Sequence, residues 1–191
     1  EAFAGSSRTQ DNSQNVVAVG EEIKKQLEAA GFGVVHDTTC HDYPSYNGSY
    51  DRSGETIQRN LEKYPDIQVT LDVHRDAMGT QDGMRIKPTA LINGKKAAQV
   101  MIISGCDDDG TLGFPNWEYN LRLGVRIQKS LSDLYPGLAR PLSFCPKKYN
   151  EHMTKGSLLV EFGTEVNTLE EVKYSGQLFG KALAETLEQL T

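Results

Sequence analysis

The sequence predicts a single α/β domain in which a mixed, mostly parallel sheet carries helices on both faces. Segments with apolar residues at helical spacing alternate with short apolar runs that are typical of buried strands. The length of 191 residues suits one hydrophobic core, and no repeat or low-complexity linker divides the chain. We therefore assign residues 1–191 to one domain.

The first third of the chain predicts helices separated by a strand and a loop. Residues 11–30 carry an apolar stripe, with Asp11, Asn12 or Ser13 as candidate N-caps and Gly31 suited to the helix end. The expected order is helix 11–30, strand 32–35, a loop over 38–50 that is rich in Tyr, Pro, Asn, Gly and Ser, and helix 53–63.

The remaining two thirds predict four strands and two long helices. An Asn93-Gly94 pair favours a tight hairpin turn between two of the strands. The expected strands are 67–73, 84–87, 99–104 and 157–162, and the expected helices are 115–134 and 169–190.

Two polar residues stand where active sites of such sheets form, at the carboxyl ends of strands. His74 directly follows the strand 67–73, and Glu161 lies near the end of the strand 157–162. A neutral imidazole is a good zinc ligand, and a carboxylate in an apolar strand has its pKa raised toward the range of a general base. The alternatives are a capping or surface histidine and a glutamate on a solvated face.

Several function classes lack support in the sequence. The net charge of −6 gives no bulk attraction for nucleic acid. Cys40, Cys106 and Cys145 form neither a disulfide framework nor a zinc-finger pattern. Nucleotide-binding glycine motifs, a nucleophile-elbow serine motif, a signal peptide and a run of about 20 apolar residues are all absent from the sequence.

Several longer motifs carry a resemblance to a known family. They run through most of the chain and include His36–Tyr43, Tyr46–Ser53, Leu71–Ala77, Asn120–Leu123, Tyr149-Asn150 and Leu158–Glu161. On these residues the sequence resembles the stage II sporulation protein P family, within the wider group of zinc-dependent N-acetylmuramoyl-L-alanine amidases.

The resemblance implies a zinc site and a set of roles. His74 matches a histidine ligand and Glu161 matches the catalytic glutamate, while Glu1 is the expected carboxylate ligand with Asp11 as the alternative. The family's first histidine is expected just upstream of Glu1, so that residues 1–191 would be an N-terminally truncated catalytic domain without its upstream membrane or targeting region. The candidate substrate-binding residues are His36, Arg52, Arg75 and Asn120.

The resemblance also implies an activity and partners. Family members cut the amide between N-acetylmuramic acid and L-alanine in peptidoglycan, and are described as cutting peptide cross-links, during engulfment in sporulation. The implied partners are stage II sporulation protein D and a membrane protein of the same complex, at an extracytoplasmic, membrane-anchored location. Two alternatives stay open: a domain that only binds cell wall, and a zinc carboxypeptidase or aminopeptidase of similar sheet topology.

Overall fold

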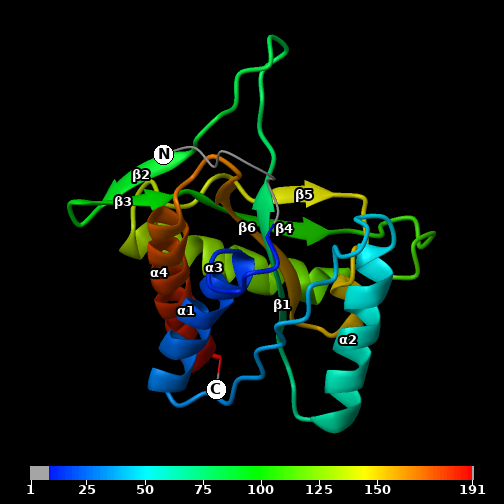
Figure 1. Cartoon of the computed structure of the whole chain (residues 1–191). Helices are drawn as coiled ribbons and strands as arrows, with labels where there is room; N and C mark the ends of the chain where they lie inside the picture. The colour runs from blue at the N-terminus through cyan, green and yellow to red at the C-terminus, as the bar shows by residue number, and fades with distance from the viewer. Residues whose placement is uncertain (1–8, 191) are drawn as a thin grey trace.

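The structure, a computed structural model, describes residues 9–190 of the chain. Helices and strands alternate along most of the sequence, and the elements are drawn in Figure 1. Their bounds are α1 Val16–Ala29, α2 Ser49–Lys63, β1 Thr70–Asp76, β2 Thr89–Ile92, β3 Lys95–Ala98, β4 Val100–Gly105, α3 Trp117–Leu134, β5 Ser143–Cys145, the short 3-10 helix η1 Glu151–Met153, β6 Ser157–Thr164 and α4 Leu169–Glu188.

The main sheet has four strands in the order β1-β6-β4-β5. The pairs β1–β6 and β4–β5 are parallel, whereas β4–β6 is antiparallel. This confirms the predicted mixed, mostly parallel sheet. The Asn93-Gly94 turn closes a separate hairpin of β2 and β3, with both turn residues at positive φ as such turns require.

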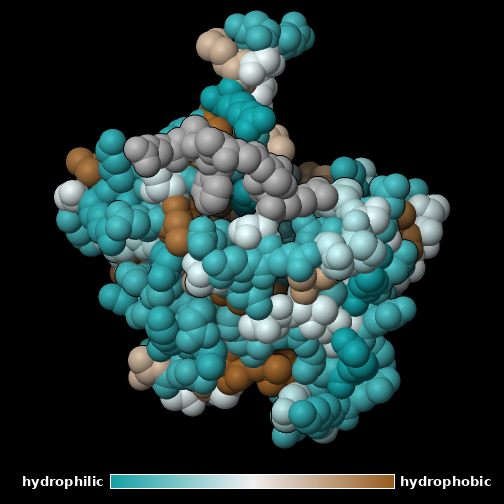
Figure 2. Space-filling model, in the orientation of Figure 1, coloured by the Kyte–Doolittle hydropathy of each residue, from teal (hydrophilic) through white to brown (hydrophobic). Residues whose placement is uncertain are grey.

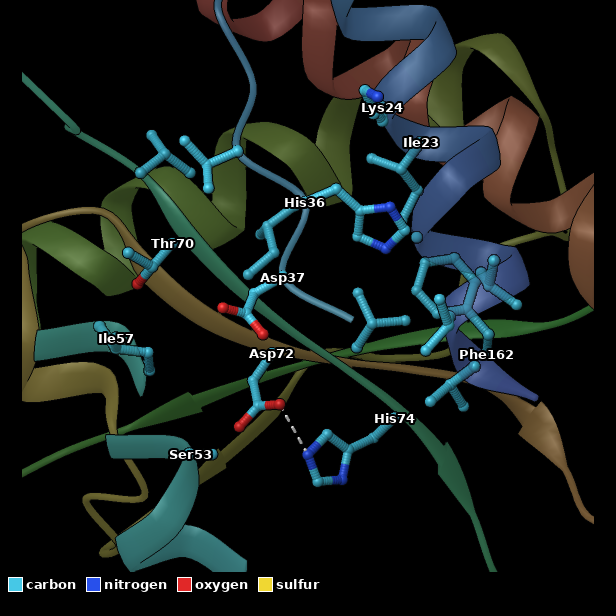
Figure 3. A pocket seen from close by; sticks show the side chains of 18 of the residues that line it. Ile23, Lys24, His36, Asp37, Ser53, Ile57, Thr70, Asp72, His74 and Phe162 are labelled. Atoms are coloured by element: carbon cyan, nitrogen blue, oxygen red, sulfur yellow. Dashed lines mark hydrogen bonds and ion pairs between the residues drawn. The ribbon is translucent and has the colours of Figure 1, made fainter. Parts of the chain in front are cut away.

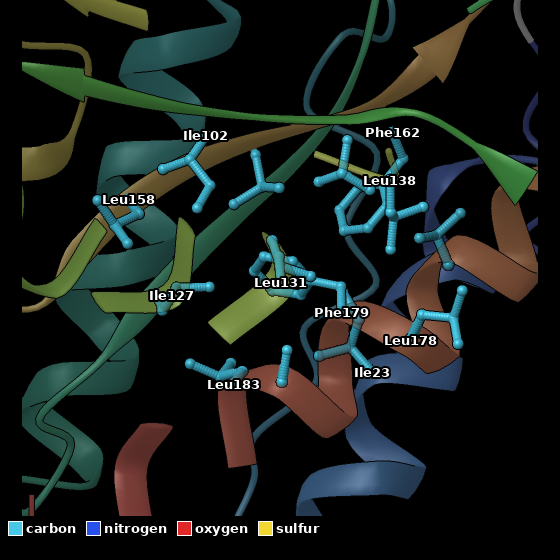
Figure 4. Packing of buried hydrophobic residues seen from close by; sticks show 14 of the residues in the cluster. Ile23, Ile102, Ile127, Leu131, Leu138, Leu158, Phe162, Leu178, Phe179 and Leu183 are labelled. Carbon is cyan, nitrogen blue, oxygen red and sulfur yellow. The ribbon is translucent and has the colours of Figure 1, made fainter. Parts of the chain in front are cut away.

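Helices α1, α3 and α4 cover one face of the main sheet. Their apolar stripes meet the inward side chains of β4 and β6 in one hydrophobic core, part of which is shown in Figure 4. Phe162 of β6 and Phe179 of α4 make an edge-to-face contact with ring centroids 5.3 Å apart. The fully buried members include Val19, Ile102, Ile127, Leu131, Leu158, Val160 and Leu183.

Helix α2 lies on the opposite face of the sheet. Its Tyr50 ring stacks on the imidazole of His74 in β1, and its Ile57 lines a small pocket together with Thr70 and Asp72 of the same strand. Few residues of α2 are buried, because this face carries polar side chains from β1. The expectation of helices on both faces is therefore confirmed, and the polar face is the one beneath α2.

Some element boundaries differ from the sequence prediction. Helix α1 begins at Val16 because Oδ1 of Asn15 accepts a hydrogen bond from the Val17 amide at 2.9 Å, so Asp11, Asn12 and Ser13 all precede the true N-cap. Helix α2 begins four residues earlier than predicted, at Ser49. Strands β2, β3 and β5 were not predicted: the Asn93-Gly94 turn was expected to join strands 84–87 and 99–104, but it joins β2 and β3.

Two predicted strands are wrong, for the same physical reason. Residues 33–40 run extended between α1 and α2 but make no backbone–backbone hydrogen bond to any described residue. Residues 84–87 contribute only an isolated bridge between Arg85 and Gly79, in a segment that projects from the body of the molecule between β1 and β2 (Figure 1). An extended sequence pattern becomes a strand only where a partner supplies the ladder.

The surface on the side seen in Figure 2 is largely polar. Hydrophilic residues dominate it, and the apolar patches are small and separated. Within residues 9–190, no helix has both the length and the apolar character needed to cross a bilayer.

Candidate active site

Strand alternation places His74 and Glu161 side by side. The two residues are register partners in the parallel pair β1–β6, so their side chains leave the same face of the sheet. In β6, Leu158, Val160 and Phe162 point into the core, which leaves Glu161 on the opposite face. The structure thus brings together the two residues that the sequence singled out.

Asp72 fixes the orientation of His74. It stands two residues earlier in β1 and therefore on the same face, and its Oδ1 accepts a hydrogen bond from Nε2 of His74 at 2.9 Å (Figure 3). Burial lowers the pKa of the imidazole, but the hydrogen bond and charge of Asp72, together with the charge of Glu161, outweigh it and raise the pKa of His74 overall. This arrangement is typical of a histidine that donates a hydrogen bond from one ring nitrogen to a carboxylate and binds a metal ion with the other.

Glu161 has the properties of a general acid–base. Burial raises the pKa of its carboxyl group to about 7, against an opposing pull from the positive charge of His74. Its Oε2 is buried and makes no hydrogen bond to a described residue. A carboxyl group that titrates near neutral pH and keeps an oxygen uncommitted can both accept and donate a proton.

A buried ion pair lies beside Glu161. Arg140 Nη2 donates to Oδ2 of Asp76 at 2.6 Å, and both side chains are largely buried. The charge of Arg140 lowers the pKa of Glu161 and that of Asp76 raises it, although both effects are smaller than that of burial. The ion pair therefore holds the end of β1 in place. Burial remains the largest influence on the pKa of Glu161.

A cavity of about 1980 Å³ opens along β1 and contains the site (Figure 3). His74 and Glu161 line it, together with residues from α1, α2 and the extended segment 33–40. Cavities that hold small ligands are typically about 300–1,000 Å³, so this one has room for a polymer segment and not only for a small molecule.

Two of the four candidate substrate-binding residues line this cavity. They are His36, from the extended segment, and Arg75, which follows His74 in β1. His36 also forms an ion pair with Glu21 through Nδ1 at 3.2 Å, which ties the segment to α1.

The other two candidates do not line the cavity. Arg52 donates from its guanidinium group to the backbone carbonyls of His41, Ser45 and Asn47, so it orders the loop before α2. Asn120 is fully buried in α3. Its Nδ2 donates to the carbonyl of Glu151 at 2.6 Å and its Oδ1 accepts from the Ser157 amide, so it supports the strand that carries Glu161.

The described residues supply only part of a zinc site. His74 is a suitable ligand with an orienting carboxylate, but no group of three His, Cys, Asp or Glu side chains within residues 9–190 is arranged to hold a metal. Glu1 lies outside the described residues. Asp11 is exposed, and its carboxylate accepts hydrogen bonds from Ser13 and Gln14. A catalytic zinc ion would need three protein ligands, so any such ion would take its remaining ligands from outside residues 9–190.

Sequence reasoning missed three contributors to the site. Asp72 was counted only as part of a strand, yet period-2 alternation puts it on the same face as His74. Tyr50 was treated as a loop residue, whereas it lies in the first turn of α2 with its ring centroid 6.0 Å from that of His74. Burial raises the pKa of Tyr50, with contributions from the charges of Asp72 and Glu161. Arg140 gave no sequence signal.

The match to a protein family settles the relationship of this chain to known proteins. The model of the family described as "Stage II sporulation protein P (SpoIIP)" matches residues 1–184. The chain belongs to the stage II sporulation protein P family. This confirms the resemblance that the sequence motifs carry, and it covers both residues of the candidate pair.

The chain resembles one known protein in sequence and another in fold. The chain is 30% identical over 172 residues to the stage II sporulation protein P of Bacillus subtilis (strain 168), an alignment covering 83% of this chain and 40% of that protein. The chain thus corresponds to less than half of that relative. The fold is similar to the CwlD amidase from Clostridioides difficile, solved in complex with the GerS lipoprotein, with a TM-score of 0.56, 11% identity and coverage of 91% of this chain and 82% of CwlD.

Proposed function

We propose that this SpoIIP-family chain is the catalytic domain of a zinc-dependent peptidoglycan hydrolase that cleaves the N-acetylmuramoyl–L-alanine amide during sporulation. The observation that carries the proposal is the pairing of Glu161, whose burial raises its pKa to about 7, with His74, which Asp72 orients, on one face of an amidase-like sheet. Cleavage within peptide cross-links is a second reaction that the same pair would support.

Zinc is the cofactor in this proposal, with His74 as one ligand. Glu1 is the proposed carboxylate ligand, and a histidine from upstream chain is the proposed third. When bound, zinc lowers the pKa of water to about 7 and polarises a carbonyl group.

The residues of the chain then have defined tasks. Glu161 takes a proton from the attacking water and later gives it to the leaving amine nitrogen, which frees the L-alanine amino group. Asp72 holds the ring of His74 in one orientation and one tautomer. The cavity along β1 accommodates the glycan or the peptide on either side of the scissile amide.

The cellular setting is proposed on the family relationship. We propose that the domain acts outside the cytoplasm, held at a membrane by other parts of the full-length protein, on peptidoglycan. Its proposed partners are stage II sporulation protein D, a glycan-cleaving enzyme, and a membrane protein of the engulfment complex. Nucleic acid is not a proposed ligand, since the net charge is −6.

The decisive experiment is product analysis on purified peptidoglycan. Zinc-loaded full-length protein, which includes the chain upstream of residue 1 and is the parent for all variants below, should release stem peptides with a free L-alanine amino group and leave muramic acid with a free lactyl carboxylate. Glu161→Gln should lose on the order of 10²–10⁴-fold in rate, because the amide cannot transfer the proton. Glu118→Gln, at an exposed position in α3, is the matched control and should cleave like the parent.

Each alternative function gives a different result. A domain that only binds cell wall would sediment with peptidoglycan and release no soluble fragments. A carboxypeptidase or aminopeptidase would release single amino acids and leave the lactyl group amide-linked. Near-parental cleavage by Glu161→Gln would contradict the assignment of Glu161 as the general acid–base residue.

A further inference from the structure

Tyr50 packs against His74 of the candidate catalytic pair and against Tyr149. Its ring stacks on His74 with an interplanar angle of 14°, and the tilted ring of Tyr149 packs against it with ring centroids 5.5 Å apart. Tyr50 also lines the cavity that Glu161 lines. The structure gives the Tyr50 hydroxyl group no hydrogen-bond partner among residues 9–190.

Tyr149 occupies a backbone conformation that its side chain disfavours. Its φ is +45°, in the left-handed region, and Asn93 in the β2–β3 turn is the only other described non-glycine residue with positive φ. Such a conformation costs a bulky residue on the order of 1–3 kcal/mol and persists only where the surroundings impose it. Tyr149 is the second residue of a tight turn from Lys148 to Glu151, closed by a hydrogen bond from the Glu151 amide to the Lys148 carbonyl at 3.0 Å. Turns with positive φ at this position usually place glycine, asparagine or aspartate there, so a tyrosine is unusual.

A hydrogen-bond network imposes this conformation on the loop. Asn150 Nδ2 donates to the carbonyl of Tyr50 at 2.9 Å and to Oγ of Ser53 at 2.7 Å, which binds the loop to the first turns of α2. The next residue, Glu151, is buried and accepts from the Gly105 amide at 2.8 Å through Oε2. The loop therefore joins α2 to β4 and holds Tyr149 beside Tyr50.

We propose that Tyr50 contacts the substrate, donating a hydrogen bond from its phenol O–H to the carbonyl oxygen of the scissile amide, and that Tyr149 is the positioning residue that holds the Tyr50 ring against His74. The inference rests on the proposed amidase function and deepens it. A phenol is a neutral O–H donor at neutral pH. A donor fixed in advance beside the acid–base residue stabilises the negative charge that develops on this oxygen in the transition state.

Steady-state kinetics on soluble muramoyl-peptide substrate tests the role of Tyr50. Tyr50→Phe keeps the ring and removes the donor, so kcat should fall roughly 10²-fold while KM stays within about threefold, since the interaction strengthens in the transition state. Binding of the uncleaved muramoyl peptide to the double variant with Glu161→Gln, measured by calorimetry, should stay within about threefold of Glu161→Gln alone. A kcat for Tyr50→Phe within about threefold of the parent would overturn the donor role.

A spectroscopic measurement tests the positioning role without reference to activity. Stacking on Tyr50 should shift the ring protons of His74 upfield in the NMR spectrum, and Tyr50→Leu should remove this shift. Tyr149→Ala should reduce the shift and lower kcat, and Tyr149→Phe should restore both. Unchanged His74 shifts and kcat in a folded Tyr149→Ala protein would overturn the positioning role.

The outcomes separate this inference from the function on which it rests. If the parent protein does not cleave the muramoyl–alanine amide at all, the proposed function fails. If the parent cleaves it and Tyr50→Phe cleaves it equally well, the proposed function stands and only the present inference fails.

Discussion

Nε2 of His74 donates a hydrogen bond to Oδ1 of Asp72 at 2.9 Å, and both side chains leave the same face of β1. Burial lowers the pKa of His74, and this bond is the largest of the influences that oppose burial and raise it. In Asp72→Asn the charge is gone and burial remains, so the pKa of His74 should fall. NMR titration of the imidazole in metal-free protein measures the change, and Asp51→Asn, at an exposed position in α2, is the control. A pKa that stays or rises in Asp72→Asn would contradict the role given to this bond.

Zinc binding should depend on His74. His74→Ala removes the proposed imidazole ligand, so zinc content by elemental analysis should drop to the background of a zinc-free sample. Asp72→Asn should weaken zinc about 10- to 100-fold, because it leaves the ligand present but poorly oriented. His152→Ala, in η1, is the matched histidine control. In the parent, a chelator should abolish cleavage and added zinc should restore it, and retention of zinc by His74→Ala would exclude this ligand.

The buried carboxyl group of Glu151 should make stability depend on pH. Burial raises its pKa to about 8 in the folded state, from 4.5 for an exposed glutamate. Between these values the folded state binds the proton more than the unfolded state does, so the free energy of unfolding falls as pH rises from about 4.5 to 8 and levels off above. The slope from this one group is at most about 1.4 kcal/mol per pH unit.

The variant Glu151→Gln isolates this contribution. The amide side chain would keep an oxygen for the Gly105 amide and cannot ionise, so denaturant unfolding should show a flatter pH dependence than the parent between about pH 5 and 8. The exposed substitution Glu118→Gln should follow the parent curve. Parallel curves for the parent and Glu151→Gln would mean that the group is ionised in the folded state.

Gly105 should tolerate no side chain. A Cβ at this position would lie 1.9 Å from the carbonyl oxygen of Lys147, in the loop that leads to Tyr149. Gly105→Ala should therefore destabilise the fold by about 1–3 kcal/mol, by the usual cost of overpacking, and lower kcat through the displaced loop. Gly33→Ala is the matched control, because a Cβ there meets nothing within 4 Å and φ is not positive. Equal melting temperatures for the two variants would show that the loop can move aside.

The sequence was informative wherever a local pattern determines structure. Period-2 alternation in residues 70–76 is enough to put His74 and Asp72 on one face, and the helical spacing of Asn120, Leu123, Gly124 and Ile127 shows that Asn120 belongs to the buried stripe of α3. The alternation places Asp72 beside His74, and the helical spacing marks Asn120 as a buried structural residue. Both were available from the sequence.

The features of the fold and of the candidate site that the sequence did not predict depend on contacts between distant segments. Whether residues 32–35 form a strand depends on a neighbouring ladder, which periodicity does not reveal. The loop that carries Tyr149 is held in place by hydrogen bonds to α2 and β4, and Arg140 reaches Asp76 across 64 positions of sequence. Such features are set by tertiary structure, so the aromatic and ionic surroundings of the pair became visible only in the fold.

The pairing of β1 with β6 has a consequence for when the site can exist. His74 and Glu161 meet across a ladder that joins residues 87 positions apart, and β6 is followed only by α4 among the described elements. During synthesis, the histidine strand is made long before its partner, and a chain interrupted before residue 157 has no catalytic carboxylate to place. The order of elements along the chain thus acts as a safeguard, since the chemistry of this pair begins only in a finished domain.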